Sequence, residues 1–178
     1  MMRASWRMLR GTLMLGATWI VAMASWSQNA SDLPKVELIA RDLQPRPIED
    51  LTQKSITRDY AYAWKTLTKA LDQNRPDLLD SYFTGLAKTN FSQLIADQRR
   101  TGVRVHYLDR GHKLNAVFYS PAGDAMQLRD QADVEIQVLD GTKTLHRERA
   151  TLHCLVLMTP GADRWLVRDL ETVGGPRP

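Results

Sequence analysis

The sequence predicts an α+β domain in which three N-terminal helices pack on one face of a curved antiparallel sheet. Two observations lead to this prediction. Apolar residues recur at helical spacing from residue 57 to about residue 100, and from residue 103 onward they alternate with polar residues as in strands. Half-buried strands need a cover on one face, and the amphipathic helices that precede them supply it.

The first predicted helix begins at Thr57. Its apolar residues recur at intervals of four, three and four positions, which places them on one helix face. They are Tyr60, Trp64, Leu67 and Leu71. Pro76 cannot continue this helix but is well suited to open the next one, with Asp77 at the positive end of that helix. We therefore expect the first helix to end before Pro76.

The second predicted helix is short and ends before Gly85. The third covers residues 86–100, where Arg99 and Arg100 suit the negative C-terminal end and Gly102 ends the helix. Its expected inner stripe consists of Ala87, Phe91, Leu94, Ile95 and Gln98.

Five segments after the helices predict strands. They are residues 103–109, 113–120, 132–138, 144–158 and 164–172. Asp140 and Gly141 predict a tight hairpin between the third and fourth of these strands. In the third strand, Ala132, Val134, Ile136 and Val138 are expected to point inward, and Asp133, Glu135 and Gln137 outward.

Residues 1–26 form a candidate export segment. Arg3, Arg7 and Arg10 precede an apolar stretch, and Ala-Met-Ala at positions 22–24 fits a signal-peptide cleavage site. The same segment is also long enough for a short membrane anchor, with the arginines in the cytoplasm. Both alternatives place the rest of the chain outside the cytoplasm. The predicted location is the bacterial periplasm or the outer face of the inner membrane.

Residues 27–56 predict a linker with a short helix near its end, because they combine prolines with mixed charge. The folded domain is then expected over residues 57–173. Residues 174–178, Gly-Gly-Pro-Arg-Pro, predict a disordered tail.

The basic excess of the sequence is concentrated at its start. The chain has 24 basic and 20 acidic residues, and residues 1–24 hold three of the arginines and no acid, so 21 basic and 20 acidic residues remain. Nucleic-acid binding needs a basic patch on the folded domain, so we expect no nucleic-acid partner. Cys154 is the only cysteine, which leaves no internal disulfide, and its apolar neighbours predict a buried thiol.

The order of these elements, with two landmarks, resembles the nuclear transport factor two-like, or SnoaL-like, superfamily over roughly residues 55–173. The landmarks are "YAWKTLTKALDQNRPDLLDSYF" and the closing "DRWLVRDLE". The resemblance implies a cystatin-like cone, in which helices on the concave face of a curved sheet leave a cavity. Within that superfamily, "LAKTNFSQLIADQRRTGVRVHYLD" is similar to the membrane-associated domain of the mitochondrial import-motor anchor and its bacterial relatives.

Enzymes need titratable groups inside a cavity, and Asp130 and His153 are the two weak catalytic candidates. Asp130 shares the inner face if one unbroken strand covers residues 125–139. The turn signals at residues 120–121 and 123–124 instead favour a hairpin connection that contains Asp130. His153 shares a strand face with Leu155 and Leu157.

The other three histidines are expected to be exposed. His106 and His146 fall opposite apolar neighbours, and His112 follows Gly111 in a predicted turn. The histidine spacing does not match a typical metal-binding motif, and the sequence lacks a phosphate-binding glycine loop. We therefore expect no metal and no cofactor.

Seven aromatic residues are candidates for lining a ligand pocket, although their spacing favours simple core packing. They are Tyr60, Trp64, Tyr82, Phe91, Tyr107, Phe118 and Trp165. Four basic residues are candidates for contact with an anionic membrane, the alternative being a solvated face and a satisfied helix end. They are Lys88, Arg99, Arg100 and Arg104.

These observations predict an exported, membrane-associated, non-enzymatic binding or scaffold domain for a protein partner or an apolar ligand. Two alternatives stay open. One is a small periplasmic isomerase or hydrolase of the SnoaL-like kind, and the other is a component of an envelope secretion complex. The sequence also leaves a homodimer open.

Overall fold

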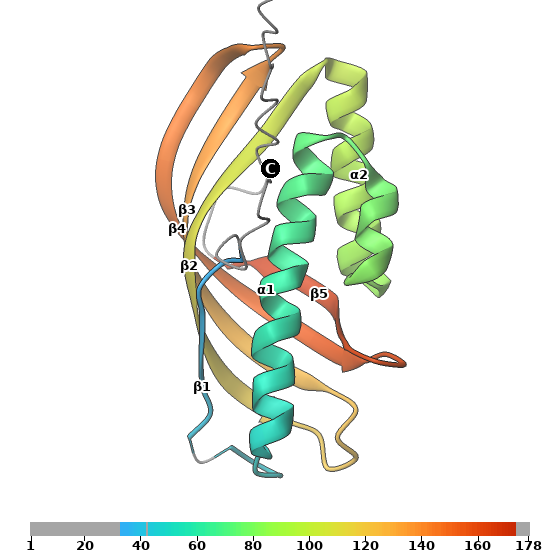
Figure 1. Ribbon diagram of the computed structural model, residues 1–178, viewed down its shortest axis with the longest axis vertical. Helices are drawn as coiled ribbons and strands as arrows, with labels where there is room; N and C mark the ends of the chain where they lie inside the picture. The colour runs from blue at the N-terminus through green and yellow to red at the C-terminus, as the bar shows by residue number, and fades with distance from the viewer. Residues whose placement is uncertain (1–32, 42, 174–178) are drawn as a thin grey trace, which may run out of the picture.

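The computed structural model describes residues 33–41 and 43–173, which form a curved five-stranded sheet with helices on its inner side (Figure 1). The predicted export segment and the predicted tail lie outside these residues. The elements are, in chain order, β1 (Val36–Ile39), α1 (Asp50–Asp72), the 3₁₀ helix η2 (Pro76–Ser81), α2 (Gly85–Thr101), β2 (Val103–Tyr119), β3 (Met126–Asp140), β4 (Lys143–Pro160) and β5 (Trp165–Thr172). The predicted α+β class is confirmed.

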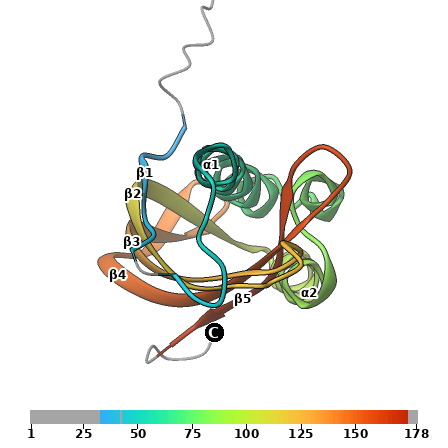
Figure 2. The same ribbon diagram turned by 90° about the horizontal axis from the view of Figure 1, so that it is seen from below.

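The strands follow one another across the sheet in the order β1-β2-β3-β4-β5. The strands β2 to β5 pair antiparallel, as predicted, but β1 pairs parallel to β2 over His112 to Asn115. The sheet is therefore mixed. Figure 2 shows both helices on the inner side of the curve that the long strands make.

The helices end where the sequence places their stop signals. The predicted stripe of α1 is buried, with Tyr60, Trp64, Leu67 and Leu71 no more than 3% exposed. Two α-helices and one short 3₁₀ helix, which opens with Pro76, occupy the places of the three predicted helices. Gly102 ends α2 with a φ of +75°, and its N–H donates to the Gln98 carbonyl at 2.9 Å.

The structure differs from the linker predicted over residues 27–56. Residues 36–39 form strand β1, with Leu38 buried in the core, and α1 already begins at Asp50. The short stretch Val-Glu-Leu-Ile is a strand only because β2 offers it a pairing edge, and that contact spans more than seventy positions. Among the described residues, no helix is both long and apolar enough to span a membrane.

The two strands predicted over residues 103–109 and 113–120 form the single strand β2. Gly111 does not make a turn. The pairing of β2 with β3 shifts its register between Asp109 and Gly111, which marks a β-bulge within one continuous strand. Its φ is +138°, and a Cβ atom there would lie 3.3 Å from the Lys35 carbonyl oxygen. The backbone angle therefore favours glycine, and the close approach of the segment before β1 leaves little room for a side chain.

Candidate functional site

Four polar side chains form a continuous network between α1, β2 and β3. Tyr60 donates its hydroxyl hydrogen to Asp130 Oδ2 at 2.7 Å, and His112 Nδ1 lies 2.8 Å from the same oxygen. His112 Nε2 lies 2.7 Å from Asp109 Oδ2. We call Tyr60, Asp130, His112 and Asp109 the polar network.

The bulge in β2 is what turns His112 inward. Side chains alternate between the two faces of a strand, and one extra residue reverses that alternation. Tyr107 packs against Trp64 of α1 before the bulge, and after it His112 and Leu114 face the core. The prediction of an exposed His112 in a turn is therefore wrong, because Gly111 continues the strand as a bulge.

The favoured prediction for Asp130, a place in a hairpin connection, is also wrong. Strand β3 begins at Met126, so the turn signals end just before it and Asp130 lies within the strand. Asp130 is 2% exposed and shares the inner face with Leu128 and Ala132, both buried. The structure thus bears out the alternative of a carboxylate on the inner face.

The geometry of the polar network fixes the charge of His112. Both ring nitrogens lie within hydrogen-bonding distance of carboxylate oxygens, which only accept, so both nitrogens carry a proton. Burial lowers the pKa of His112, but the hydrogen bonds and the charges of Asp109 and Asp130 together outweigh burial and raise it to about 9. Burial, and then the charge of Asp130, raises the pKa of Tyr60 well above its usual value.

The polar network is almost closed to solvent. The side chains of His112 and Asp130 are 0% exposed, whereas that of Asp109 is 12% exposed. Asp130 Oδ1 is buried and has no hydrogen-bond partner among the described residues. A substrate could meet this network only at Asp109.

Cys154 is buried, as predicted, and lies opposite Asp130 in the β3–β4 pairing. Burial, together with the charge of Asp130, raises the pKa of its thiol to about 11. The thiol is therefore protonated at neutral pH and unreactive.

A pocket of about 610 Å³ lies at the edge of β2 that β1 leaves uncovered. Helix α1 contributes Lys65, Thr68, Lys69 and Asp72, β2 contributes residues 106–110, and residues 33–35 complete the wall. We call it the α1–β2 pocket. Asp109 belongs both to this pocket and to the polar network.

The structure does not gather the seven aromatic candidates around one pocket. Only Tyr107 lines the α1–β2 pocket. Tyr60, Trp64 and Trp165 are buried in the core, and Tyr82 and Phe91 pack against it. Phe118 is 38% exposed.

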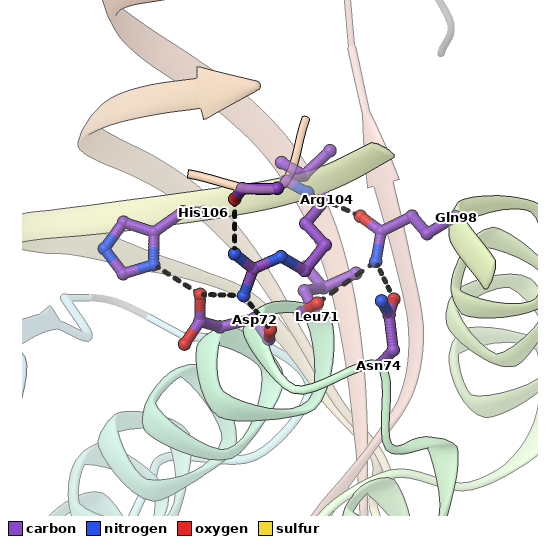
Figure 3. Close-up of polar contacts among 8 residues, drawn as sticks. Leu71, Asp72, Asn74, Gln98, Arg104 and His106 are labelled. Carbon is purple, nitrogen blue, oxygen red and sulfur yellow. Dashed lines mark hydrogen bonds and ion pairs between the residues drawn. The ribbon is translucent and has the colours of Figure 1, made fainter. Parts of the chain in front are cut away.

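The basic candidates have partners within the protein. Arg99 donates to the Asn74 carbonyl oxygen just after α1, and Arg104 donates to the Gly141 carbonyl oxygen. Arg104 also donates to the Asp72 carbonyl oxygen at the end of α1 (Figure 3). Lys88 pairs with Asp80 and Arg100 with Asp97. Arg99 and Arg104 thus satisfy carbonyl oxygens at the end of α1, whereas the sequence placed Arg99 at the end of its own helix.

The same junction contributes Asp72 and His106 to the lining of the α1–β2 pocket. Asp72 Oδ1 lies 3.1 Å from His106 Nδ1 and 3.8 Å from Arg104 Nη1. Figure 3 shows these side chains between the last turn of α1 and strand β2, beside Gln98. His106 is thus tied to α1, whereas the sequence analysis expected it in solvent.

The second catalytic candidate, His153, is exposed on β4, and so is His146. The structure therefore does not bring His153 to Asp130 or to the α1–β2 pocket. Among the described residues, no group of three or more histidine, cysteine or acidic side chains is arranged to hold a metal ion.

Glu135 is a further buried acid that sequence reasoning did not single out. It is 1% exposed although it points outward as predicted, because Arg110 and Arg147 cover it at 3.1 and 2.6 Å. A hydrogen bond from Gln137, together with the two arginines, lowers the pKa of Glu135 to about 2. Burial alone would raise this pKa. It ties β2 to β4 on the outer face.

No family model and no curated protein matches this sequence. Solved structures do. The intermembrane space region of the chloroplast protein ARC6 aligns with a TM-score of 0.62 and 11% identity, over 72% of this chain and 100% of that one. ActVI-ORFA from Streptomyces coelicolor aligns with a TM-score of 0.46 and 10% identity, over 67% of this chain and 95% of that one.

At these identities the likeness concerns the fold alone. It agrees with the curved sheet and its inner helices, so the chain has a nuclear transport factor two-like cone fold. Proteins with this fold include binding domains and enzymes, so function has to be argued from the site.

Proposed function

We propose that the chain is an exported, membrane-associated binding domain without enzymatic activity, and that its binding site is the α1–β2 pocket. One observation carries this proposal. The paired His112 and Asp130 side chains are fully enclosed, whereas the α1–β2 pocket is open at the edge of the sheet. An acid–base group must reach its substrate to act, but a pocket at the sheet edge can bind without chemistry.

The position of the pocket supports a role close to a membrane. Leu33 and Pro34 line the pocket, so only six residues, 27–32, separate its wall from the predicted anchor at residues 1–26. The seven steps from residue 26 to Leu33 span at most about 25 Å when fully extended. A retained anchor would thus hold the α1–β2 pocket within a short distance of the bilayer surface.

An isomerase or hydrolase is the second candidate, and one observation favours it. Asp109 lines the pocket and receives a hydrogen bond from His112, which is in turn held by Asp130. Such an arrangement can orient a carboxylate that works as a general base. In this version Asp109 is the catalytic residue and His112 and Asp130 position it.

Site-specific photo-crosslinking in the native host tests the binding proposal. A photoreactive residue replaces Lys69 at the pocket wall, and in the control it replaces Lys113, which is exposed on β2 outside the pocket. We expect a discrete adduct from position 69 and none from position 113. Equal labelling from both positions, or none from either, would contradict the proposal.

The same strains separate the two candidate functions. Asp109→Asn removes a general base but leaves the pocket wall in place. If the adduct persists and the variant still complements a deletion of the gene, the binding proposal stands. If the adduct persists but complementation is lost, Asp109 acts chemically and the enzymatic candidate is favoured.

A further inference from the structure

We propose that the α1–β2 pocket binds an amphiphilic anion, meaning a molecule with one carboxylate or phosphate head and an apolar body. This inference rests on the proposed function, because it names the ligand class of the same pocket.

The rim of the pocket carries more positive than negative charge. Four cations and two acids line it, which leaves a net charge of +2. The cations are Lys35, Lys65, Lys69 and Arg110, and the acids are Asp72 and Asp109. A concave site with an excess of one sign of charge attracts ligands of the opposite sign.

Both acids already have hydrogen-bond or ion-pair partners within the protein. Asp72 contacts His106 and lies 3.8 Å from Arg104, which does not line the pocket. Asp109 accepts a hydrogen bond from the His112 ring at 2.7 Å and one from the Gly111 N–H at 2.8 Å. Both carboxylates therefore already have partners other than Lys35 and Lys69.

Two of the rim lysines, in contrast, face solvent. Lys35 and Lys69 are exposed, and within the described part of the chain neither makes an ion pair. Arg110 forms an ion pair with Glu135 on the outer face of the sheet. Two exposed ammonium groups, one from the segment before β1 and one from α1, thus line the same pocket and can pair with an anionic head.

The lining of the pocket also has an apolar part. Leu33 and Leu108 line the pocket, and Tyr107 packs edge-on against Trp64 with ring centroids 6.3 Å apart. The volume of about 610 Å³ is in the range of small-molecule pockets. A ligand with an apolar body for these side chains and an anionic head for the lysines satisfies both parts of the lining.

Isothermal titration of the full chain tests the inference with octanoate, octyl phosphate and uncharged octanol. We expect at least one of the two anions to bind about tenfold tighter than octanol, because only an anion gains the rim charges. The double variant Lys35→Glu with Lys69→Glu should lose this preference. Its matched control, Lys113→Glu with Lys143→Glu, changes the net charge equally outside the pocket and should keep it.

Three results would overturn the inference. They are no binding of either anion, octanol as tight as the anions, and equal affinity in the double variant and its control. The comparison of the probes on the unchanged chain stays decisive even if a variant folds poorly. A crosslinked adduct at position 69 without anion binding would refute only the ligand class, whereas the absence of both would refute the binding function too.

Discussion

His112 links two carboxylates inside the core, and its proton is held by both of them. The pKa of about 9 lies above the usual 6.5, so the folded state binds this proton more tightly than the unfolded chain does. The resulting stabilisation is complete below about pH 6.5 and is lost as the pH rises through about 9.

We therefore predict that the free energy of unfolding falls between pH 6 and pH 9. The difference between about 9 and 6.5 corresponds to an upper limit of about 3 kcal/mol. Urea unfolding at a series of pH values measures this fall.

Substitutions of single histidines show which histidine causes the pH dependence of the free energy of unfolding. His112→Asn should be less stable at pH 6 and should show little further loss up to pH 9. His146→Asn, at an exposed histidine of β4, should keep the slope of the unchanged chain. A slope that survives in His112→Asn would mean that another group carries it.

Tyr60 offers a second test at the scale of one residue. Its hydroxyl donates to Asp130 in a fully buried position, and hydrogen bonds to charged acceptors contribute more than neutral ones. Tyr60→Phe should lower the free energy of unfolding by about 2 kcal/mol. Tyr62→Phe removes a hydroxyl from a tyrosine that is 38% exposed, and should cost less than about 0.5 kcal/mol. Equal losses in the two variants would show that the bond to Asp130 contributes nothing.

The sequence could indicate these residues only in part. The alternation around Asp130 already fitted an inner face, but the turn signals before Met126 favoured a loop, and sequence alone does not say where a strand resumes. His112 was missed because glycine marks both turns and bulges. The only signal for a bulge was Gly111 between two strand-like segments, and the contact that leaves little room for a side chain there comes from Lys35, far away in the chain.

At the scale of elements, Gln98 joins α2 to the end of α1 and to the start of β2. Its amide donates to the Leu71 carbonyl at 3.1 Å and to Asn74 Oδ1 at 2.8 Å (Figure 3). Its carbonyl oxygen accepts from the Val105 N–H at 2.7 Å. This one side chain therefore fixes how three elements meet.

We predict that Gln98→Leu lowers the free energy of unfolding by about 2 to 3 kcal/mol, because the Val105 N–H loses its acceptor in a partly buried place. Gln93→Leu makes the same change at an exposed position of the same helix and should have little effect. Chemical denaturation of the two variants checks this. A similar midpoint for both would contradict the role given to Gln98.

The helices and most strands were predictable because their signals are local. Proline and glycine set the ends of α1 and α2, and alternation marks β3, β4 and β5. Strand β1 was not predictable, because four residues after a proline carry little pattern and become a strand only by pairing with β2. The mixed sheet follows from that one distant contact.

At the scale of the whole molecule, the cone holds its aromatic residues as core. Tyr60, Trp64 and Trp165 fill the space between α1 and the sheet, and the α1–β2 pocket lies instead at the sheet edge. Of the seven aromatic residues predicted to line a ligand cavity, only Tyr107 lines the α1–β2 pocket. The sequence could not predict this difference, because the same aromatic stripe can line a cavity or fill it.

Export and membrane attachment remain predictions from residues 1–26. They matter for the proposed function because the α1–β2 pocket begins so soon after that segment. Membrane fractionation, with the intact mass of the chain from its native host, distinguishes a cleaved domain from a tethered one. We expect the chain in the membrane fraction, and a free periplasmic chain would remove this part of the proposal.

Native mass spectrometry of the chain from its own host tests most directly whether the α1–β2 pocket is a binding site. The account predicts a bound molecule of discrete mass on the unchanged chain, and its loss from the Lys35→Glu, Lys69→Glu double variant. The same unoccupied mass from both chains would contradict it.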